Sequence, residues 1–189
     1  MDIQKMKRAL DDMRMDSALK NKKGIAFISA SIFVWTAILI IHLTDMAPEM
    51  KNLFTWFAVA FLLPLAIMIT KLIKIKFQNN DNPINQLGIL FTVNQVLYIL
   101  IACWVYAAVP QKMIMVLAMI FGAHLLPFGW LYMSKSYTVS ALIISVGMLI
   151  VGSLFASWVV ALCMLVYEII FTALLCFEIK KLEHDAGKR

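Results

Sequence analysis

The positively charged residues of this chain are shared very unevenly between the two ends of its apolar stretches. Six stretches of about twenty residues each follow one another, at residues 24–43, 53–73, 87–109, 112–133, 137–156 and 158–179. If the chain crosses a membrane at each stretch, all but two of its 17 Lys and Arg residues fall on one side, the exceptions being Lys51 and Lys112. Positive residues near spans are retained in the cytoplasm during insertion. The distribution therefore predicts both termini in the cytoplasm.

Composition and span length agree on the fold class. The chain is 62% hydrophobic and only 15% charged, far from the balance of a soluble domain. About twenty helical residues cross a hydrocarbon core of roughly 30 Å, and lipid cannot hydrogen-bond an open backbone, so the spans must be helices. The sequence predicts an all-α, polytopic membrane protein, with a single six-helix transmembrane bundle over residues 24–179.

Two shorter segments flank the predicted bundle. Residues 1–23 place Ile3, Met6, Leu10 and Met13 at helical spacing among charged residues, which predicts a cytoplasmic amphipathic segment. A helix at the membrane surface and a solvated extension of the first span both fit this pattern. Residues 180–189 form a basic cytoplasmic tail. The net charge of +6 is explained by topology-setting residues that face anionic lipid headgroups, so the lipid bilayer is the expected partner and nucleic acid is not.

Two spans contain residues with a structural signature. Pro64 lies inside the second span and is expected to kink it, because proline removes a backbone hydrogen bond. The fifth span carries small residues that end in Gly152-x-x-x-Ala156. Small residues allow helices to approach closely in lipid. This face is either a packing seam inside the bundle or an interface with a second copy or another membrane protein.

Glu168 is the one acidic residue near the centre of a span, roughly 15 Å from either end of the sixth helix. His124 lies at similar depth in the fourth span. Ionisable residues at this depth are costly and are usually functional. On the third span, Gln95 and Tyr98 share a face at about the same depth, and two further polar residues, Asn94 and Tyr106, extend it.

These residues support two hypotheses. In the first, Glu168, His124, Gln95 and Tyr98, with Asn94 and Tyr106, converge on a buried site that binds or translocates a small polar or cationic solute, or relays protons. In the second, the same groups only hydrogen-bond to one another and hold helices together, and the protein is structural or regulatory.

The sequence gives little support to an enzyme or a metal protein. It has no P-loop, His-Glu-x-x-His or Gly-x-Ser-x-Gly motif, and no catalytic residue or cofactor is indicated. Several methionines and His42 map to the side opposite the termini. Thioethers and imidazole are copper ligands, but methionine is also a common apolar filler.

Several short motifs resemble an uncharacterised family of small six-helix integral membrane proteins of bacteria. They are Lys23-Gly-Ile-Ala-Phe27 with Ser31 and Trp35, Asn82-Pro83 with Leu87-Gly88 and Gln95-x-x-Tyr98, and Gly122-Ala-His-Leu-Leu-Pro127. The resemblance spans most of the chain. It implies a multi-pass protein of the bacterial plasma membrane, and it implies no substrate.

Overall fold

The protein folds into a long bundle of helices, seen in a computed structural model that describes residues 2–75 and 82–188. The helices in these ranges are α1 (Ile3–Lys20), α2 (Ile25–His42), α3 (Pro48–Ala60), α4 (Leu62–Leu72), α5 (Asn85–Ala108), α6 (Met113–Leu131), α7 (Lys135–Leu154) and α8 (Ser157–Ala186), with short 3-10 turns at Lys22–Gly24 and Pro110–Lys112. Six segments in the described ranges are long and apolar enough to cross a membrane, with α3 and α4 together forming one of them. The predicted all-α class is confirmed, and the six predicted spans correspond to these six segments.

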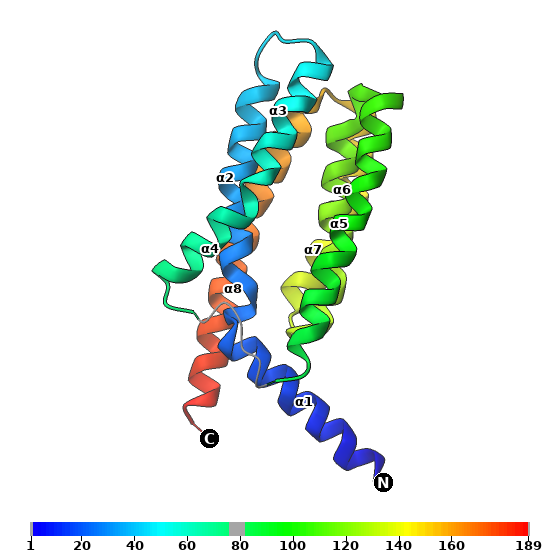
Figure 1. Ribbon diagram of the computed structural model, residues 1–189. Helices are drawn as coiled ribbons and strands as arrows, with labels where there is room; N and C mark the ends of the chain where they lie inside the picture. Colours follow the sequence, from blue (N-terminus) through cyan, green and yellow to red (C-terminus); the bar gives the residue numbers. More distant parts are fainter. Residues whose placement is uncertain (1, 76–81, 189) are drawn as a thin grey trace.

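The second span is broken where its proline requires it. Pro64 has no N–H to donate to the carbonyl of Ala60, and the helix is interrupted at Phe61, between α3 and α4. In Figure 1, α4 bends away from the line of α3 and away from α5. The expected kink is therefore present, and it separates α4 from α5.

A left-handed elbow joins α1 to α2. Lys22, Lys23 and Gly24 all have positive φ, at 43°, 48° and 68°. Non-glycine residues adopt this conformation at a cost, and here Lys23 is held by the tertiary structure. Its carbonyl accepts a hydrogen bond from the Tyr137 hydroxyl at 2.7 Å. The first span and α1 are thus separate helices.

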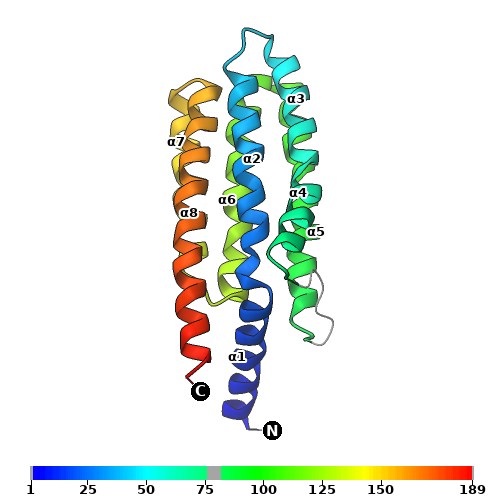
Figure 2. The same cartoon turned by 90° about the vertical axis from the view of Figure 1, so that its left-hand side faces the viewer.

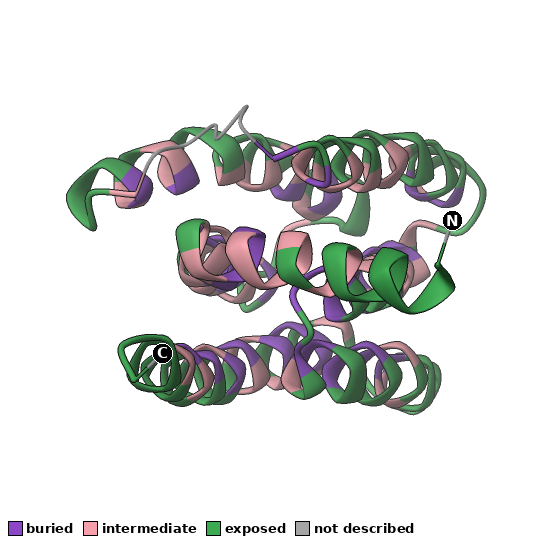
Figure 3. Ribbon diagram, turned by 90° about the horizontal axis from the view of Figure 1, so that it is seen from below, coloured by how far each residue is buried: buried purple, intermediate pink, exposed green. Residues whose placement is uncertain are grey.

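The helices form two walls. One wall contains α3 and α4, α2 and α8, with α2 packing against each of the others, and the second contains α5, α6 and α7, with α6 in the middle. The walls meet along one edge, where α7 and α8 pack together. Figures 2 and 3 show the same arrangement from the side and from below, with α3, α4 and α5 on the edge opposite α7 and α8. The two chain ends lie at the same end of the bundle.

Glycines allow α6 and α7 to pack closely. A Cβ atom on Gly122 would lie 2.7 Å from Ile144 Cγ2 and 2.8 Å from the backbone nitrogen of Ser145. Gly152 of α7 is buried, and Met115 of α6 occupies the space where its Cβ would lie. The Gly152 side of the small-residue face is thus a seam within the chain, whereas Ala156 is exposed.

Polar contacts tie the two walls at both ends. At the end that carries the termini, Glu178 of α8 accepts hydrogen bonds from Lys23 Nζ (2.6 Å) and from Ser134 and Ser136 at the start of α7. At the opposite end, Asn52 Nδ2 of α3 donates to the carbonyl of Pro110 at 2.8 Å. The middle of the bundle, between these ties, has no such link between α3–α4 and α5 in the ranges described.

Candidate ligand cavity

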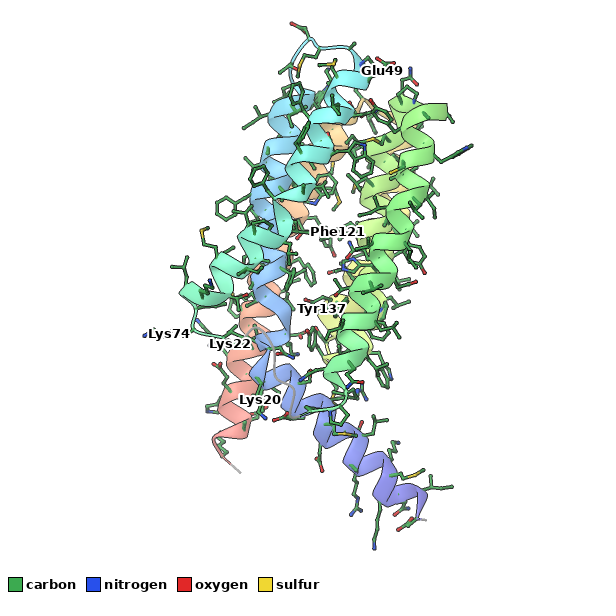
Figure 4. The ribbon with its side chains drawn as sticks, viewed as in Figure 1. Lys20, Lys22, Glu49, Lys74, Phe121 and Tyr137 are labelled. Atoms are coloured by element: carbon green, nitrogen blue, oxygen red, sulfur yellow. The ribbon has the colours of Figure 1, made fainter. Side chains whose placement is uncertain are left out.

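A cavity of about 380 Å³ lies between the two walls and extends from the middle of the bundle toward the end that carries the termini. Apolar side chains from α2, α3, α4, α5 and α6 make up most of its wall. The polar groups that reach it are Thr92, Gln95, His124, Tyr132 and Tyr137. Phe121 and Tyr137, labelled in Figure 4, lie in the space between the walls. This volume and this largely apolar wall are typical of sites for small molecules.

His124 is oriented by its own helix. Its Nδ1 lies 2.7 Å from the carbonyl oxygen of Phe121. A carbonyl can only accept, so Nδ1 carries a hydrogen and, in the neutral ring, Nε2 is an acceptor. The rings of Phe121 and Phe128 pack edge-on against the imidazole, with centroids 5.5 and 5.6 Å away. The imidazole is therefore fixed in place at the cavity wall.

Gln95 of α5 lines both this cavity and a smaller one of about 50 Å³ next to it. The smaller cavity also contacts Ser31, Trp35 and Phe121. Gln95 thus faces the space between the walls, opposite the first span. Its amide offers both a donor and an acceptor.

Glu168 is completely buried and lies behind Ser31. Its Oε2 is 2.6 Å from the Ser31 hydroxyl, which is also 2.7 Å from the carbonyl oxygen of Ile28. Its Oε1 has no hydrogen-bond partner in the described structure, and the same is true of Thr172 Oγ1, one turn further along α8. Glu168 itself does not line either cavity, so Ser31 stands between the carboxyl group and the smaller cavity.

Counting hydrogens in this group shows what the two short contacts require. Both are hydrogen-bond distances, but Ser31 has a single hydroxyl hydrogen and the Ile28 carbonyl has none to give. Both bonds form at once if Glu168 is protonated and donates to Ser31, which then donates to Ile28. A neutral acid also avoids the high cost of an unpaired buried carboxylate.

The structure brings together only part of the residue set expected from the sequence. Gln95 and His124 share the main cavity, and Glu168 is linked to the smaller cavity through Ser31. Tyr98 is 40% exposed on α5 and contacts neither cavity. Asn94 and Tyr106 are half-buried and are also outside both.

Helix geometry explains why the residue set predicted from the sequence differs from the one observed at the cavities. The cavity face of α5 is centred on Thr92, Gln95, Val96 and Ile99, and position 98 lies roughly a third of a turn away from that centre. Ser31, Tyr132 and Tyr137 enter the site from other elements. Only the pairing of helices places them there, and no spacing in the sequence reports that pairing.

The fold is that of a helical protein with six segments apolar enough to cross a membrane and a cavity between its two walls. Residues 10–178 match a family whose description is "Family of unknown function (DUF7010)", and the chain belongs to this family. This agrees with the uncharacterised family that the sequence motifs resemble. Neither the curated proteins nor the solved structures include a match to the chain.

Proposed function

We propose that this protein binds a small, largely apolar solute in the cavity between its two walls and holds or translocates it within the membrane. The cavity itself is the observation that supports this proposal most directly. Its wall is mainly apolar, and the amide of Gln95 and the Nε2 acceptor of the fixed His124 ring supply polar groups. A solute with an N–H or O–H donor and an apolar body suits this wall better than a strongly polar one.

The position of the cavity supports entry from the bilayer. Leu63 of α4 and Val96 of α5 both line it, and they are 52% and 59% exposed. The bend at Phe61 moves α4 away from α5 at this level. An apolar solute dissolved in lipid would therefore reach the cavity laterally, between these two helices.

Glu168 is a proton-binding group close to the proposed solute site. Glu168 contacts Ser31, which lines the smaller cavity. A protonated Glu168 can therefore release a proton when the solute binds and take it up again when the solute leaves. Proton relay and solute binding would then share one region of the bundle. In this proposal the termini lie in the cytoplasm of a bacterium, since nearly all positive residues belong to that end.

Native mass spectrometry of protein purified in a mild detergent tests the binding proposal. We expect a small molecule to accompany the wild type and to be lost from the double variant Gln95→Leu/His124→Leu. Tyr98→Phe, on the same helix but outside the cavity, is the matched control and should keep it. The proposal is wrong if the wild type carries no small molecule, or if the double variant keeps it.

One observation favours a structural or regulatory role instead. The Glu168–Ser31 contact joins α8 to α2, which pack extensively together, so these polar groups also hold helices in place. In this alternative, the exposed Ala156 end of the Gly152/Ala156 face contacts a second copy or another membrane protein. A single oligomeric state that Ala156→Leu disrupts, with no small molecule bound, would favour it.

A further inference from the structure

A second pocket lies at the end of the bundle farthest from the chain termini. It measures about 220 Å³, and the residues that line it include His42, Pro48, Lys51, Gln111, Lys112 and Ser157. It contains Lys51 and Lys112, the two basic residues that break the charge asymmetry of the sequence. Its described lining includes no acidic residue.

Both lysines are fixed with their ammonium groups at this pocket. Lys51 Nζ donates to the carbonyl of His42 at 3.3 Å, where α2 ends. Lys112 Nζ donates to the carbonyls of Gly152 at 2.7 Å and Ser153 at 3.4 Å, near the end of α7. An ammonium group has three hydrogens, so after these contacts Lys51 keeps two donors for a ligand and Lys112 keeps one.

Two helix starts add to the positive potential. The pocket contacts Pro48 and Ser157, the first residues of α3 and α8, and neither helix has a side-chain cap at its N-terminus. Unpaired N–H groups and the helix dipole favour an anion at such ends. Glu49 lies in the first turn of α3 and offsets the dipole of that helix, whereas the first turn of α8 contains no acidic residue. Asp45 and Glu49 are both exposed and outside the pocket lining.

A buried histidine fixes one wall of the pocket. Thr55 Oγ1 donates to the carbonyl of Lys51 at 2.9 Å, so it accepts from His42 Nε2 at 3.1 Å. In the neutral ring, His42 Nδ1 then accepts a hydrogen bond from the Ser157 hydroxyl at 2.9 Å. This series of hydrogen bonds joins α2, α3 and α8 and gives the pocket a defined shape.

We infer that this pocket binds a small phosphate-bearing anion, either inorganic phosphate or the phosphate of a lipid headgroup. The two ammonium groups also face the carbonyl ends of α2 and α7. With the uncapped start of α8 and no acid in the described lining, they favour a negatively charged ligand. The volume is below that of most sites for drug-sized molecules and suits a compact anion. The site is separate from the cavity between the walls and does not depend on its function.

The test measures the thermal stability of protein purified in a phosphate-free maltoside detergent. We expect the Tm to rise saturably with inorganic phosphate and not with chloride at equal ionic strength. Gln111→Glu puts a carboxylate in the pocket while both lysines keep their contacts, and it should weaken the phosphate effect about tenfold or more. Gln86→Glu, an exposed position at the other end of the bundle, is the matched control and should behave as wild type.

Two further measurements complete the test. The double variant Lys51→Gln/Lys112→Gln should lose the phosphate response, and if it does not fold, Gln111→Glu still decides. Native mass spectrometry after reconstitution with phosphatidylglycerol identifies the source of the anion. A retained lipid that soluble phosphate displaces indicates a headgroup, and no retained lipid indicates the free anion. The inference is overturned if phosphate acts no differently from chloride, or if Gln111→Glu responds as wild type does.

Discussion

Two glutamates of the same helix, the buried Glu168 and the half-buried Glu178, have opposite environments. Glu178 accepts four hydrogen bonds, from Lys23 Nζ, the Ser134 hydroxyl, and the hydroxyl and backbone nitrogen of Ser136. Glu168 has one partner. The same side chain thus serves as a paired carboxylate at the end of the bundle and as an acid with a single neutral contact in its middle.

Removing the charge of Glu178 should be costly. Glu178→Gln leaves Lys23, only 5% exposed, without its counter-ion, and an unpaired buried charge costs about 3 kcal/mol. Glu183→Gln is the control. Its partner Lys22 is 3.5 Å away and both side chains are more than 40% exposed, so we expect a change below about 0.5 kcal/mol. Chemical unfolding in detergent measures both, and equal effects would contradict the assignment.

Removing the ionisable group of Glu168 should change stability little. Gln has nearly the shape of a protonated Glu and can donate to Ser31, so Glu168→Gln should alter the free energy of unfolding by less than about 1.5 kcal/mol. Infrared difference spectroscopy between wild type and variant should show a protonated carboxylic acid band. A stabilisation of several kcal/mol, with a carboxylate band, would instead mean that an ionised Glu168 had been removed.

At the scale of single elements, the α6–α7 pair depends on the absence of a side chain at a few positions. A Cβ atom on Gly129 would be 2.5 Å from Thr138 Oγ1 and 3.0 Å from its backbone nitrogen, whereas nothing lies within 4 Å of a Cβ atom on Gly147. Both glycines are inside helices. Replacing them by alanine therefore separates the cost of a steric clash from the gain in helix propensity.

Gly129→Ala should destabilise the bundle by about 1–3 kcal/mol because the two helices must move apart. Gly147→Ala should be neutral or stabilising by up to about 1 kcal/mol, since alanine favours helix more than glycine does. A protein of this size shifts its Tm by roughly 2–4 °C per kcal/mol, which thermal unfolding resolves. A Gly129→Ala variant as stable as Gly147→Ala would show that the seam is loose.

The helix α1 is docked through polar contacts that depend on pH. Asp16 accepts hydrogen bonds from Asn82 Nδ2 (2.9 Å) and pairs with Lys20 Nζ (2.8 Å). Partial burial raises the pKa of this carboxyl, but the hydrogen bonds from Lys20 and Asn82 outweigh it and hold the pKa below its ordinary value. A depressed pKa means that the contact stabilises docking above the ordinary pKa of about 4 and is lost as pH falls through the lower folded value.

Hydrogen exchange of α1 checks this dependence. Exchange in α1, corrected for the intrinsic effect of pH, should rise below about pH 4 in the wild type. In Asp16→Asn it should be raised at neutral pH and should lack the additional acid-dependent step. An unchanged acid response in Asp16→Asn would place the sensitivity elsewhere in the helix.

At the scale of the whole molecule, the sequence predicted the spans well and the site only in part. Hydrophobic stretches and Pro64 predict the helices and the break between α3 and α4, because both follow from local chemistry. The depth of Glu168 and His124 is also local information. Their neighbours are not, because depth alone does not say which helices are adjacent. The spacing on α5 also predicts that Tyr98 shares the Gln95 face, but Tyr98 lies outside the cavity.

The division into two walls produces the cavity. At one edge of the bundle α7 packs against α8, which closes that edge. At the opposite edge the bend at Phe61 separates α4 from α5 and leaves the edge open. A large side chain at the open edge should therefore block the cavity without removing any polar group. Val96 and Val93 are both exposed on α5, at 59% and 52%, and only Val96 contacts the cavity.

The claim that a ligand occupies the cavity between the walls can be tested with density maps of the protein in lipid nanodiscs. The maps compare the wild type with Val96→Trp and Val93→Trp. We expect non-protein density between Gln95 and His124 in the wild type and in Val93→Trp, and its loss in Val96→Trp, where the indole closes the entrance. A wild-type map with α4 packed against α5 and no space between the walls would contradict the claim.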